Sequence, residues 1–378
     1  MGKSSGDVIW QDRYSRQIKF AAIGQSGQQL LQEATVLIVG SGALGASLAQ
    51  HLTRAGVKKI RLVDRDYVEP SNLQRQMLFT ERDALQMLPK AIAAREALRQ
   101  INREVEIEAI VAEVSRSNVA DFMDGVQLVL DGTDNAAIRL LLSDSCFALG
   151  IPYLFGGVAG AEGMSALLIP GQTACLRCVI GDESLLGNAD TCDTVGVLSP
   201  AVEMVVAMQI MEALKWLTNN RAALHGEWVS FDLWSLYIRR SRLPKRVEAC
   251  SHCAVKEIAA GHEDDFQQNL PSSDSDQTID ISNNRYEAAV LCGRDSIQVT
   301  VSEEVNLNLD LEKLVIQLQQ LGCSIFQNKY LVKATVITGE RLVVFGDGRI
   351  LVQGTSEIEK AYQLCDQYIL ALDLEQSI

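Results

Sequence analysis

The chain has 378 residues, enough for one large and one small domain, and 47% of them are apolar, which is typical of a globular protein with a sizeable core. Its formal net charge of −14 argues against nucleic acid or an anionic membrane as the main partner. The N-terminal stretch is polar and the most apolar long stretch, 195–217, carries charged residues, so we expect a cytoplasmic protein without a membrane span.

Residues 35–150 alternate short β-branched runs with helical stretches. The expected strands are 35–40, 60–64, 105–114 and 126–131, and the expected helices include 47–56 and 89–101. Strands separated by helices predict a parallel sheet covered on both faces. Further on, we expect glycine-containing β segments over 152–169, a polar loop over 181–194, a helix near 197–218 and a strand over 228–234.

Residues 257–284 hold seven acidic residues and no Lys or Arg, which is typical of a flexible linker. Beyond it, the pattern predicts a β-α-β-β-α order. We therefore expect an α/β fold, with a doubly wound, mostly parallel Rossmann-like sheet in domain 1–256, an acidic linker at 257–284, and a small α+β domain at 285–378.

A glycine motif follows the first expected strand and opens a helix. Its glycines, Gly40, Gly42 and Gly45, allow close approach of a nucleotide, and Asp64 at the end of the next strand can accept hydrogen bonds from ribose hydroxyls. This pattern predicts a nucleotide site but does not separate NAD from ATP.

The segment after Asp64 gathers cationic and amide side chains, namely Asn72, Arg75, Gln76 and then Lys90, together with the carboxylate of Asp66. An enzyme that cleaves a triphosphate needs such groups, because charge builds up on the phosphate oxygens in the transition state. The alternative is a solvated loop followed by a surface lysine.

The sequence Asp-Gly-Thr-Asp-Asn, 131–135, stands at the carboxyl end of an expected strand, where side chains face the ligand crevice of an open α/β sheet. Asp134 could hold Mg²⁺ against the phosphates. Alternatively, it caps the following helix.

Nine cysteines in a cytoplasmic chain are not expected to form disulfides. Four of them form two Cys-x-x-Cys pairs, Cys175/Cys178 and Cys250/Cys253, which is typical of a metal site.

Taken together, RYSRQIKF, GSGALG, DRDYVEPSNLQRQ, LPKAIAAREAL, DGTDN, CLRC, TCDTVGVLSP and CSHC occur in an order that resembles the ubiquitin-activating-enzyme-like adenylyltransferases of the ThiF/MoeB/HesA type. This family activates the thiamine-thiazole and molybdopterin sulfur carriers. The resemblance covers about 12–254, and LCGRDSIQV beyond it looks like the longer thiazole-biosynthesis, ThiF-like type.

The resemblance implies an enzyme that adenylates the C-terminal glycine carboxylate of a ThiS- or MoaD-like ubiquitin-like carrier and releases pyrophosphate. The glycine loop and Asp64 would hold adenosine, Arg75 and Lys90 would neutralise the phosphates with help from Asn72 and Gln76, and Asp134 would bind magnesium. Arg16 would reach into the neighbouring subunit's phosphate site, which implies a homodimer.

The resemblance further implies one structural zinc on Cys175, Cys178, Cys250 and Cys253, with His252 as a bystander. Cys192 stands in the polar loop before a helix, a position that can lower a thiol pKa, and some relatives use a cysteine there to bond the carrier or a sulfur donor. The alternative is an unreactive loop cysteine. A sulfurtransferase would be a further partner.

Three other functions stay open at this point. Within the family, the acyl group could belong to another peptide or to a tRNA base, although an acidic chain disfavours RNA. The glycine motif alone would also fit an NAD-dependent oxidoreductase or a non-catalytic binding module, but Arg75, Lys90 and Asp134 argue against both.

Overall fold

The computed structural model describes residues 12–181, 195–253, 286–291, 295–301 and 310–369, and the chain divides into two compact units, Met1–Ser272 and Ser273–Ile378. The predicted acidic linker and Cys192 lie outside the described residues. Among the described residues, no helix is long and apolar enough to cross a membrane.

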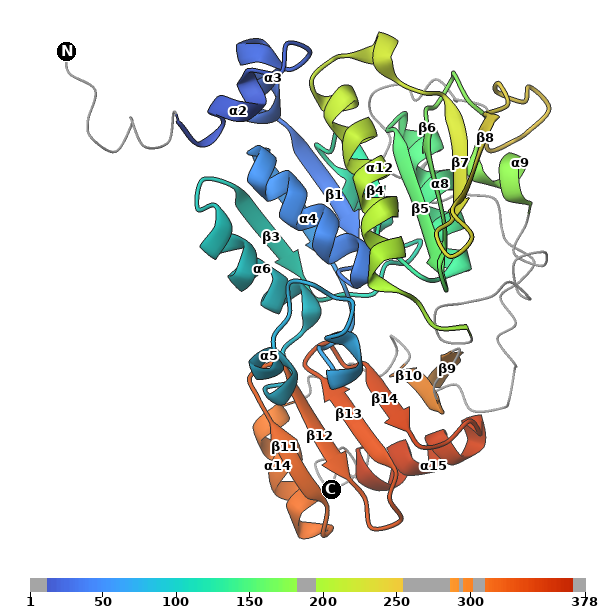
Figure 1. The fold of residues 1–378 in the computed structure, drawn as a ribbon. Coiled ribbons are helices and arrows are strands. Elements are labelled where there is room, and N and C mark those ends of the chain that lie inside the picture. The colour runs from blue at the N-terminus through green and yellow to red at the C-terminus, as the bar shows by residue number, and fades with distance from the viewer. Residues whose placement is uncertain (1–11, 182–194, 254–285, 292–294, 302–309, 370–378) are drawn as a thin grey trace. The chain divides into compact units, whose positions relative to one another are not determined.

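The first unit is built on an eight-stranded sheet with the spatial order β3-β2-β1-β4-β5-β6-β7-β8 (Figure 1). The strands β3 to β5 in this order run parallel, whereas β6, β7 and β8 are antiparallel additions at one side. Their bounds are β1 (Thr35–Val39), β2 (Lys59–Val63), β3 (Glu106–Ile110), β4 (Leu128–Asp131), β5 (Tyr153–Ala159), β6 (Glu162–Leu168), β7 (Glu227–Asp232) and β8 (Tyr237–Arg242). The expected mostly parallel α/β sheet is confirmed.

Helices cover both faces of this sheet. Their bounds are α2 (Ser15–Ile18), α3 (Gly24–Leu31), α4 (Ala43–Ala55), η1 (Pro70–Asn72), α5 (Glu81–Leu85), α6 (Lys90–Ile101), α7 (Val119–Met123), α8 (Ala136–Leu149), α9 (Leu176–Ile180), α12 (Ser199–Leu217) and η2 (Arg221–Ala223).

Apolar side chains point alternately to the two faces of the sheet, and they pack in two separate apolar cores. Val36 and Ile38 of β1 pack in a core with α4, α6 and α12, whereas Leu37 and Val39 pack in a second core with α7 and α8. Because side chains of a strand point alternately to opposite faces, a strand that is apolar at every position is buried on both sides. Figure 1 shows α4 and α12 lying side by side over one face.

The strand order reverses between β1 and β4. From β1 the chain proceeds outward through β2 and β3, then returns to β4 on the other side of β1. In an open α/β sheet, the loops that leave the carboxyl ends of the strands at such a switch point diverge and leave a crevice for a ligand. Here the two loops are the glycine motif after β1 and 131–135 after β4.

The second unit is a six-stranded antiparallel sheet of order β11-β12-β13-β14-β10-β9, with helices α14 (Leu311–Gln320) and α15 (Ile358–Tyr368). Its strands are β9 (Tyr286–Leu291), β10 (Ser296–Val301), β11 (Ser324–Gln327), β12 (Leu331–Thr335), β13 (Arg341–Phe345) and β14 (Ile350–Gln353). One core unites the helices with alternate strand residues such as Ile297, Val299, Val332 and Val344.

The α+β class of this unit is confirmed, but the predicted β-α-β-β-α order is wrong. The run 289–301 was expected as one strand and instead contributes to an antiparallel pair, with Leu291 of β9 opposite Ser296 of β10. The short strand β11 has only two apolar residues, Ile325 and Phe326, too few for a periodic signal.

Candidate active site and metal centre

The two loops at the switch point contact each other through glycines. Gly40 has φ +84°, in the left-handed region, and a Cβ on it would lie 2.7 Å from the carbonyl oxygen of Gly132. A Cβ on Gly45 would lie 1.7 Å from the carbonyl oxygen of Gly40. A side chain on Gly40 would therefore separate the turn after β1 from the turn after β4, and one on Gly45 would distort the glycine loop itself.

Gly42 differs from these two glycines. It is the N-cap residue of α4 with φ −71°, and the nearest neighbour of a Cβ there would be Nε2 of Gln76 at 3.8 Å. The protein itself therefore leaves room at Gly42, at a helix N-terminus whose amide groups favour an anion.

Asp64 organises the glycine loop from the neighbouring strand. One of its carboxylate oxygens, Oδ2, accepts hydrogen bonds from the Ser41 amide at 2.6 Å and from Ser41 Oγ at 3.0 Å, and the other, Oδ1, accepts from the Asp66 amide at 2.7 Å. Burial raises the pKa of this carboxyl, while the Lys90 charge lowers it. Because each carboxylate oxygen has more than one lone pair, Asp64 can also accept from a ribose, as expected.

Lys90 is the first residue of α6, and its side chain is only 6% exposed. Its Nζ lies 3.0 Å from Oδ2 of Asp66, so two of the predicted site residues already form an ion pair. Arg75 is half-buried just after η1 and donates from Nη1 to the Ser71 carbonyl at 3.0 Å. The expectation of a merely solvated lysine does not fit this burial.

Asn72 and Gln76 lie on either side of Arg75 on the same turn, where the backbone amide of Gln76 donates to the backbone carbonyl of Asn72 at 2.9 Å. Both side chains are buried. Asn72 Oδ1 accepts from the Glu69 amide at 3.0 Å, but Asn72 Nδ2 and Gln76 Oε1 are buried without a hydrogen-bond partner among the described residues. Such atoms are costly unless a ligand or water satisfies them, so they fit a site for a polar ligand.

Asp131 was not singled out from the sequence, yet it is the fully buried anchor of the second loop. Its Oδ2 accepts from Tyr153 Oη at 2.8 Å and lies 3.3 Å from Arg139 Nε, and its Oδ1 accepts from the amide and hydroxyl of Thr133. Burial raises its pKa, while Arg139 opposes the shift. These contacts fix the backbone that presents Asp134.

Asp134 is exposed at the carboxyl end of the parallel strands. The helix that follows is capped by Asn135, whose Oδ1 accepts from the Ile138 amide at 3.0 Å. The capping alternative for Asp134 is therefore wrong. A carboxylate at this position is of the type that Mg²⁺ prefers.

Arg16 lies far from this group in its own chain. Its neighbour Gln17 donates to the carbonyl of Ala55, the last residue of α4, whereas the glycine loop is at the first residue of α4. A helix of 13 residues is about 20 Å long. Arg16 is thus beyond side-chain reach of its own phosphate loop, and Figure 1 shows α2 at the end of the sheet where β1 begins.

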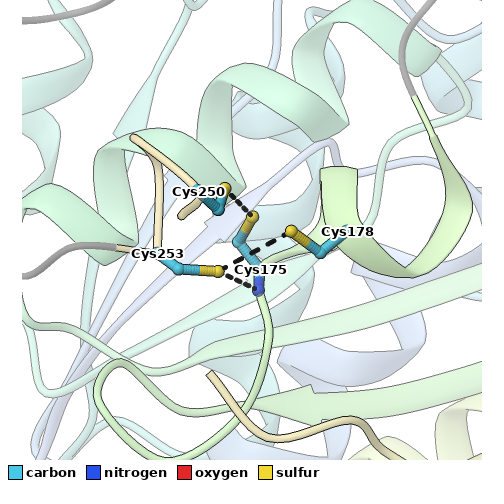
Figure 2. Close-up of side chains that lie close together, drawn as sticks. All are labelled: Cys175, Cys178, Cys250 and Cys253. Carbon is cyan, nitrogen blue, oxygen red and sulfur yellow. Dashed lines mark hydrogen bonds between the residues drawn. The ribbon is translucent and has the colours of Figure 1, made fainter. Parts of the chain in front are cut away.

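The four predicted metal ligands converge although they come from segments about 75 residues apart (Figure 2). Their sulfur atoms all lie within 4.8 Å of one another, with Cys175–Cys250 at 3.9 Å and Cys178–Cys253 at 3.8 Å. A tetrahedron of thiolates about 2.3 Å from a Zn²⁺ ion has sulfur atoms about 3.8 Å apart. The donors and spacings therefore fit a tetrahedral metal ion with no open position.

The surroundings of the clustered cysteines shift their pKa values in opposite directions. Burial raises the pKa of Cys178 to about 12. For Cys250, burial is opposed by hydrogen bonds from the Cys253 amide, the Cys178 thiol and the His252 amide, and its pKa falls to about 7. Four thiolates held this closely need a positive charge at their centre.

Comparison with known proteins identifies the family. The ThiF family model matches residues 14–252. The chain is 38% identical to the sulfur carrier protein ThiS adenylyltransferase of Bacillus subtilis, over 94% of this chain and 99% of that one. The chain belongs to the ThiF family.

Other members of the family match a shorter part of this ThiF-family chain. The molybdopterin-synthase adenylyltransferase of Escherichia coli is 36% identical over 64% of this chain and 95% of its own length. The SAMP-activating enzyme E1 of Haloferax volcanii is 37% identical over 60% and 83%. The solved structure of E. coli MccB with ATP has a TM-score of 0.56 at 21% identity, over 64% of this chain and 74% of that one, and supports the fold alone.

Proposed function

We propose that this chain adenylates the C-terminal glycine carboxylate of a ThiS-like sulfur carrier with ATP and releases pyrophosphate, as a step of thiamine-thiazole formation. The observation that carries the proposal is the pairing of the two switch-point loops, with Lys90, Asn72, Arg75 and Gln76 grouped after the ribose-binding strand. The relative that matches 94% of this chain is a ThiS adenylyltransferase, which supports the same reaction.

The reaction needs no protein nucleophile. A carrier carboxylate oxygen attacks the α-phosphorus of ATP, the bond from that phosphorus to the bridging oxygen breaks, and pyrophosphate leaves with that oxygen. An acyl adenylate remains. The protein contributes by holding the two reactants together and by stabilising the charge that develops on the phosphate oxygens.

Each side chain has a specific proposed task in that step. Lys90 and Arg75 neutralise phosphate oxygens, and two amide donors position them: Asn72 Nδ2, which is buried without a partner among the described residues, and Nε2 of Gln76. Asp64, set by Ser41, binds the ribose. Asp134 would hold Mg²⁺, whose chemistry is to neutralise the departing pyrophosphate.

Coverage of the chain favours the thiazole pathway over the molybdopterin pathway. The ThiS adenylyltransferase matches 94% of the chain and therefore extends through both units, whereas the molybdopterin relative matches 64%. A MoaD-like carrier, another peptide and a tRNA-linked carboxylate are the alternatives. The net charge of −14 disfavours the RNA substrate.

We further propose a homodimer in which Arg16 serves the partner subunit's phosphate site. The support is geometric, because Arg16 is exposed and about a helix length away from its own glycine loop. The ion of the four-cysteine cluster is proposed to be structural zinc, since four thiolates in a closed tetrahedron are typical of that metal.

Two parts of the proposal concern sulfur. Cys192, which lies outside the described residues, is proposed to bond the carrier or a sulfur donor transiently, and a sulfurtransferase is the donor we expect. Neither is needed for adenylation itself.

Exchange of labelled pyrophosphate into ATP tests the proposed reaction. With Mg²⁺ and a ThiS-type carrier ending in glycine, exchange is expected, and removal of that terminal glycine should abolish it. A MoaD-type carrier should support much weaker exchange. Strong exchange with the MoaD-type carrier alone would assign the chain to the molybdopterin pathway, and NADH formation without exchange would make it an oxidoreductase.

A further inference from the structure

Asp144 lies in the third turn of α8, beside the four-cysteine cluster, and is 7% exposed. Its carboxylate contacts two cationic or polar side chains at once. Oδ2 accepts from Nε and Nη2 of Arg177, each at 2.9 Å, and Oδ1 lies 3.1 Å from Nδ1 of His252. Nothing in the proposed adenylation step uses this buried carboxylate.

The positions of the two partners in the sequence explain why the arrangement matters. Arg177 stands between Cys175 and Cys178, and His252 stands between Cys250 and Cys253. Each Cys-x-x-Cys segment thus contributes one side chain to the same acceptor. His252, expected to be a bystander, is no ligand of the cluster but has a partner next to it.

A second contact anchors the first segment to the same helix. Ser143 Oγ accepts a hydrogen bond at 3.1 Å from the amide of Leu176, the first residue of α9. Two consecutive residues of α8 therefore bind the 175–178 segment, and one of them also binds the 250–253 segment. The two segments meet on α8 as well as at their sulfur atoms.

These contacts are strong because they join charged groups that are largely buried. The Arg177–Asp144 pair is charge-assisted and nearly removed from water, with the Arg177 side chain 17% and the Asp144 side chain 6% exposed. The four sulfur atoms come from segments about 75 residues apart, so an ion that had to assemble them alone would bear the full entropy cost of closing that loop. A pre-formed contact reduces what the ion must supply.

We propose that Asp144 is a positioning residue for the metal centre: it holds the two Cys-x-x-Cys segments in register through Arg177 and His252. The bound ion is then released slowly because both segments must leave α8 before the four thiolates can separate. This inference does not depend on the adenylation reaction.

Zinc release from the full-length protein tests it. Loaded protein is mixed with an excess of a chromogenic chelator, and the rate of zinc transfer is followed. Asp144→Asn keeps the shape of the side chain and removes its charge, and should accelerate release by about ten-fold to a hundred-fold, the usual effect of losing a group that supports metal ligands. Cobalt loading gives an independent readout, because distortion of the tetrahedron changes the visible spectrum of Co²⁺.

Two further variants separate positioning from general loss of stability. Val129→Ala removes two methyl groups from β4, a fully buried strand of the same unit that contributes no ligand to the cluster, and should lower the unfolding midpoint without changing zinc release. His252→Ala removes one of the two side-chain contacts of Asp144 and should accelerate zinc release less than Asp144→Asn does.

The proposal would be overturned if the Asp144→Asn variant released zinc at the wild-type rate. It would also be overturned if Val129→Ala accelerated zinc release as much as Asp144→Asn does. If Asp144→Asn does not fold, His252→Ala decides the question, because the His252 side chain is less buried than that of Asp144, at 17% against 6% exposed. An unchanged release rate in that variant would then reject the role of Asp144.

Discussion

Lys90 Nζ lies 3.0 Å from Asp66 Oδ2, so the cation expected to meet the phosphates is held by a carboxylate of the same site. The lysine side chain is 6% exposed and would be costly to bury without that partner. The pair fixes the Lys90 side chain next to the crevice between the two switch-point loops.

Lys90→Ala and Arg75→Ala should each reduce carrier-dependent pyrophosphate exchange at least a hundred-fold, on the order of the loss expected for one group that stabilises developing charge. The fold should persist by circular dichroism. Arg95→Ala is the matched control, since it removes a charge from the same helix, α6, where Arg95 pairs only with its neighbour Glu96 among the ion pairs described. Full exchange activity in both variants would show that Lys90 and Arg75 do not stabilise the charge on the phosphates.

Gly42→Ala should separate binding from folding. The protein leaves space for the methyl group, so the fold should persist, but Gly42 is an N-cap residue with ψ −145°, where alanine is less favourable than glycine, and a loss of stability of up to about 1 kcal/mol is expected. The methyl group would occupy space that the nucleotide needs, so KM for ATP should rise about ten-fold or more. Gly45→Ala, which overlaps the Gly40 carbonyl, is the contrasting variant and should not fold normally. Unchanged KM in Gly42→Ala would place the nucleotide elsewhere.

Metal analysis should find about one zinc per chain. Cys178→Ser should lose the ion and lower the unfolding midpoint, since an ion present at a thousand times its dissociation constant stabilises the native state by about 4 kcal/mol. Cys323→Ser in the second unit should keep the metal. A metal-free protein with normal stability would contradict this prediction.

Mixing variants tests the proposed sharing of sites between subunits. Arg16→Ala and Lys90→Ala homodimers should both be inactive in exchange. After subunit exchange between equal amounts, half of the dimers are mixed and one of their two sites is intact, so about a quarter of wild-type activity should return. Failure to recover activity, with mixed dimers demonstrated by mass, would mean that Arg16 does not act across the interface.

Cys192→Ser should retain exchange, because attack by a carboxylate on the α-phosphate needs no thiol. If Cys192 relays sulfur, the same variant should not support thiocarboxylate formation on the carrier in a reconstituted assay. Brief iodoacetamide treatment should label Cys192 faster than the four clustered cysteines. Slow labelling together with normal thiocarboxylate yield would leave an ordinary loop cysteine.

The sequence predicts those features whose signal is local. Glycine spacing, the buried β-branched runs and the Cys-x-x-Cys pairs each follow from backbone or ligand geometry within a few residues. Strand β8 had no such signal: all six of its residues are exposed and three of them are arginines, so neither alternation nor apolarity marks it.

Asp131 and Asp144 were missed for a different reason. Their partners, Tyr153 for one and Arg177 and His252 for the other, lie 22, 33 and 108 residues away along the chain. In the sequence, an aspartate that will be buried cannot be told from one on the surface, because its hydrogen-bond donors are brought to it only by the tertiary structure. Side-chain networks of this kind depend on the fold and cannot be derived from spacing.

The glycine contact at the switch point also limits which substitutions this chain can accept. A Cβ on Gly40, Gly45 or Gly132 meets main-chain atoms of another member of the trio, so no compensating side-chain replacement can relieve the overlap. A single substitution at any of these three glycines should therefore prevent normal folding. Gly42, where a Cβ would meet only Nε2 of Gln76 at 3.8 Å, has no such packing constraint, so its substitution can report on ligand binding without disrupting the contact between the two loops.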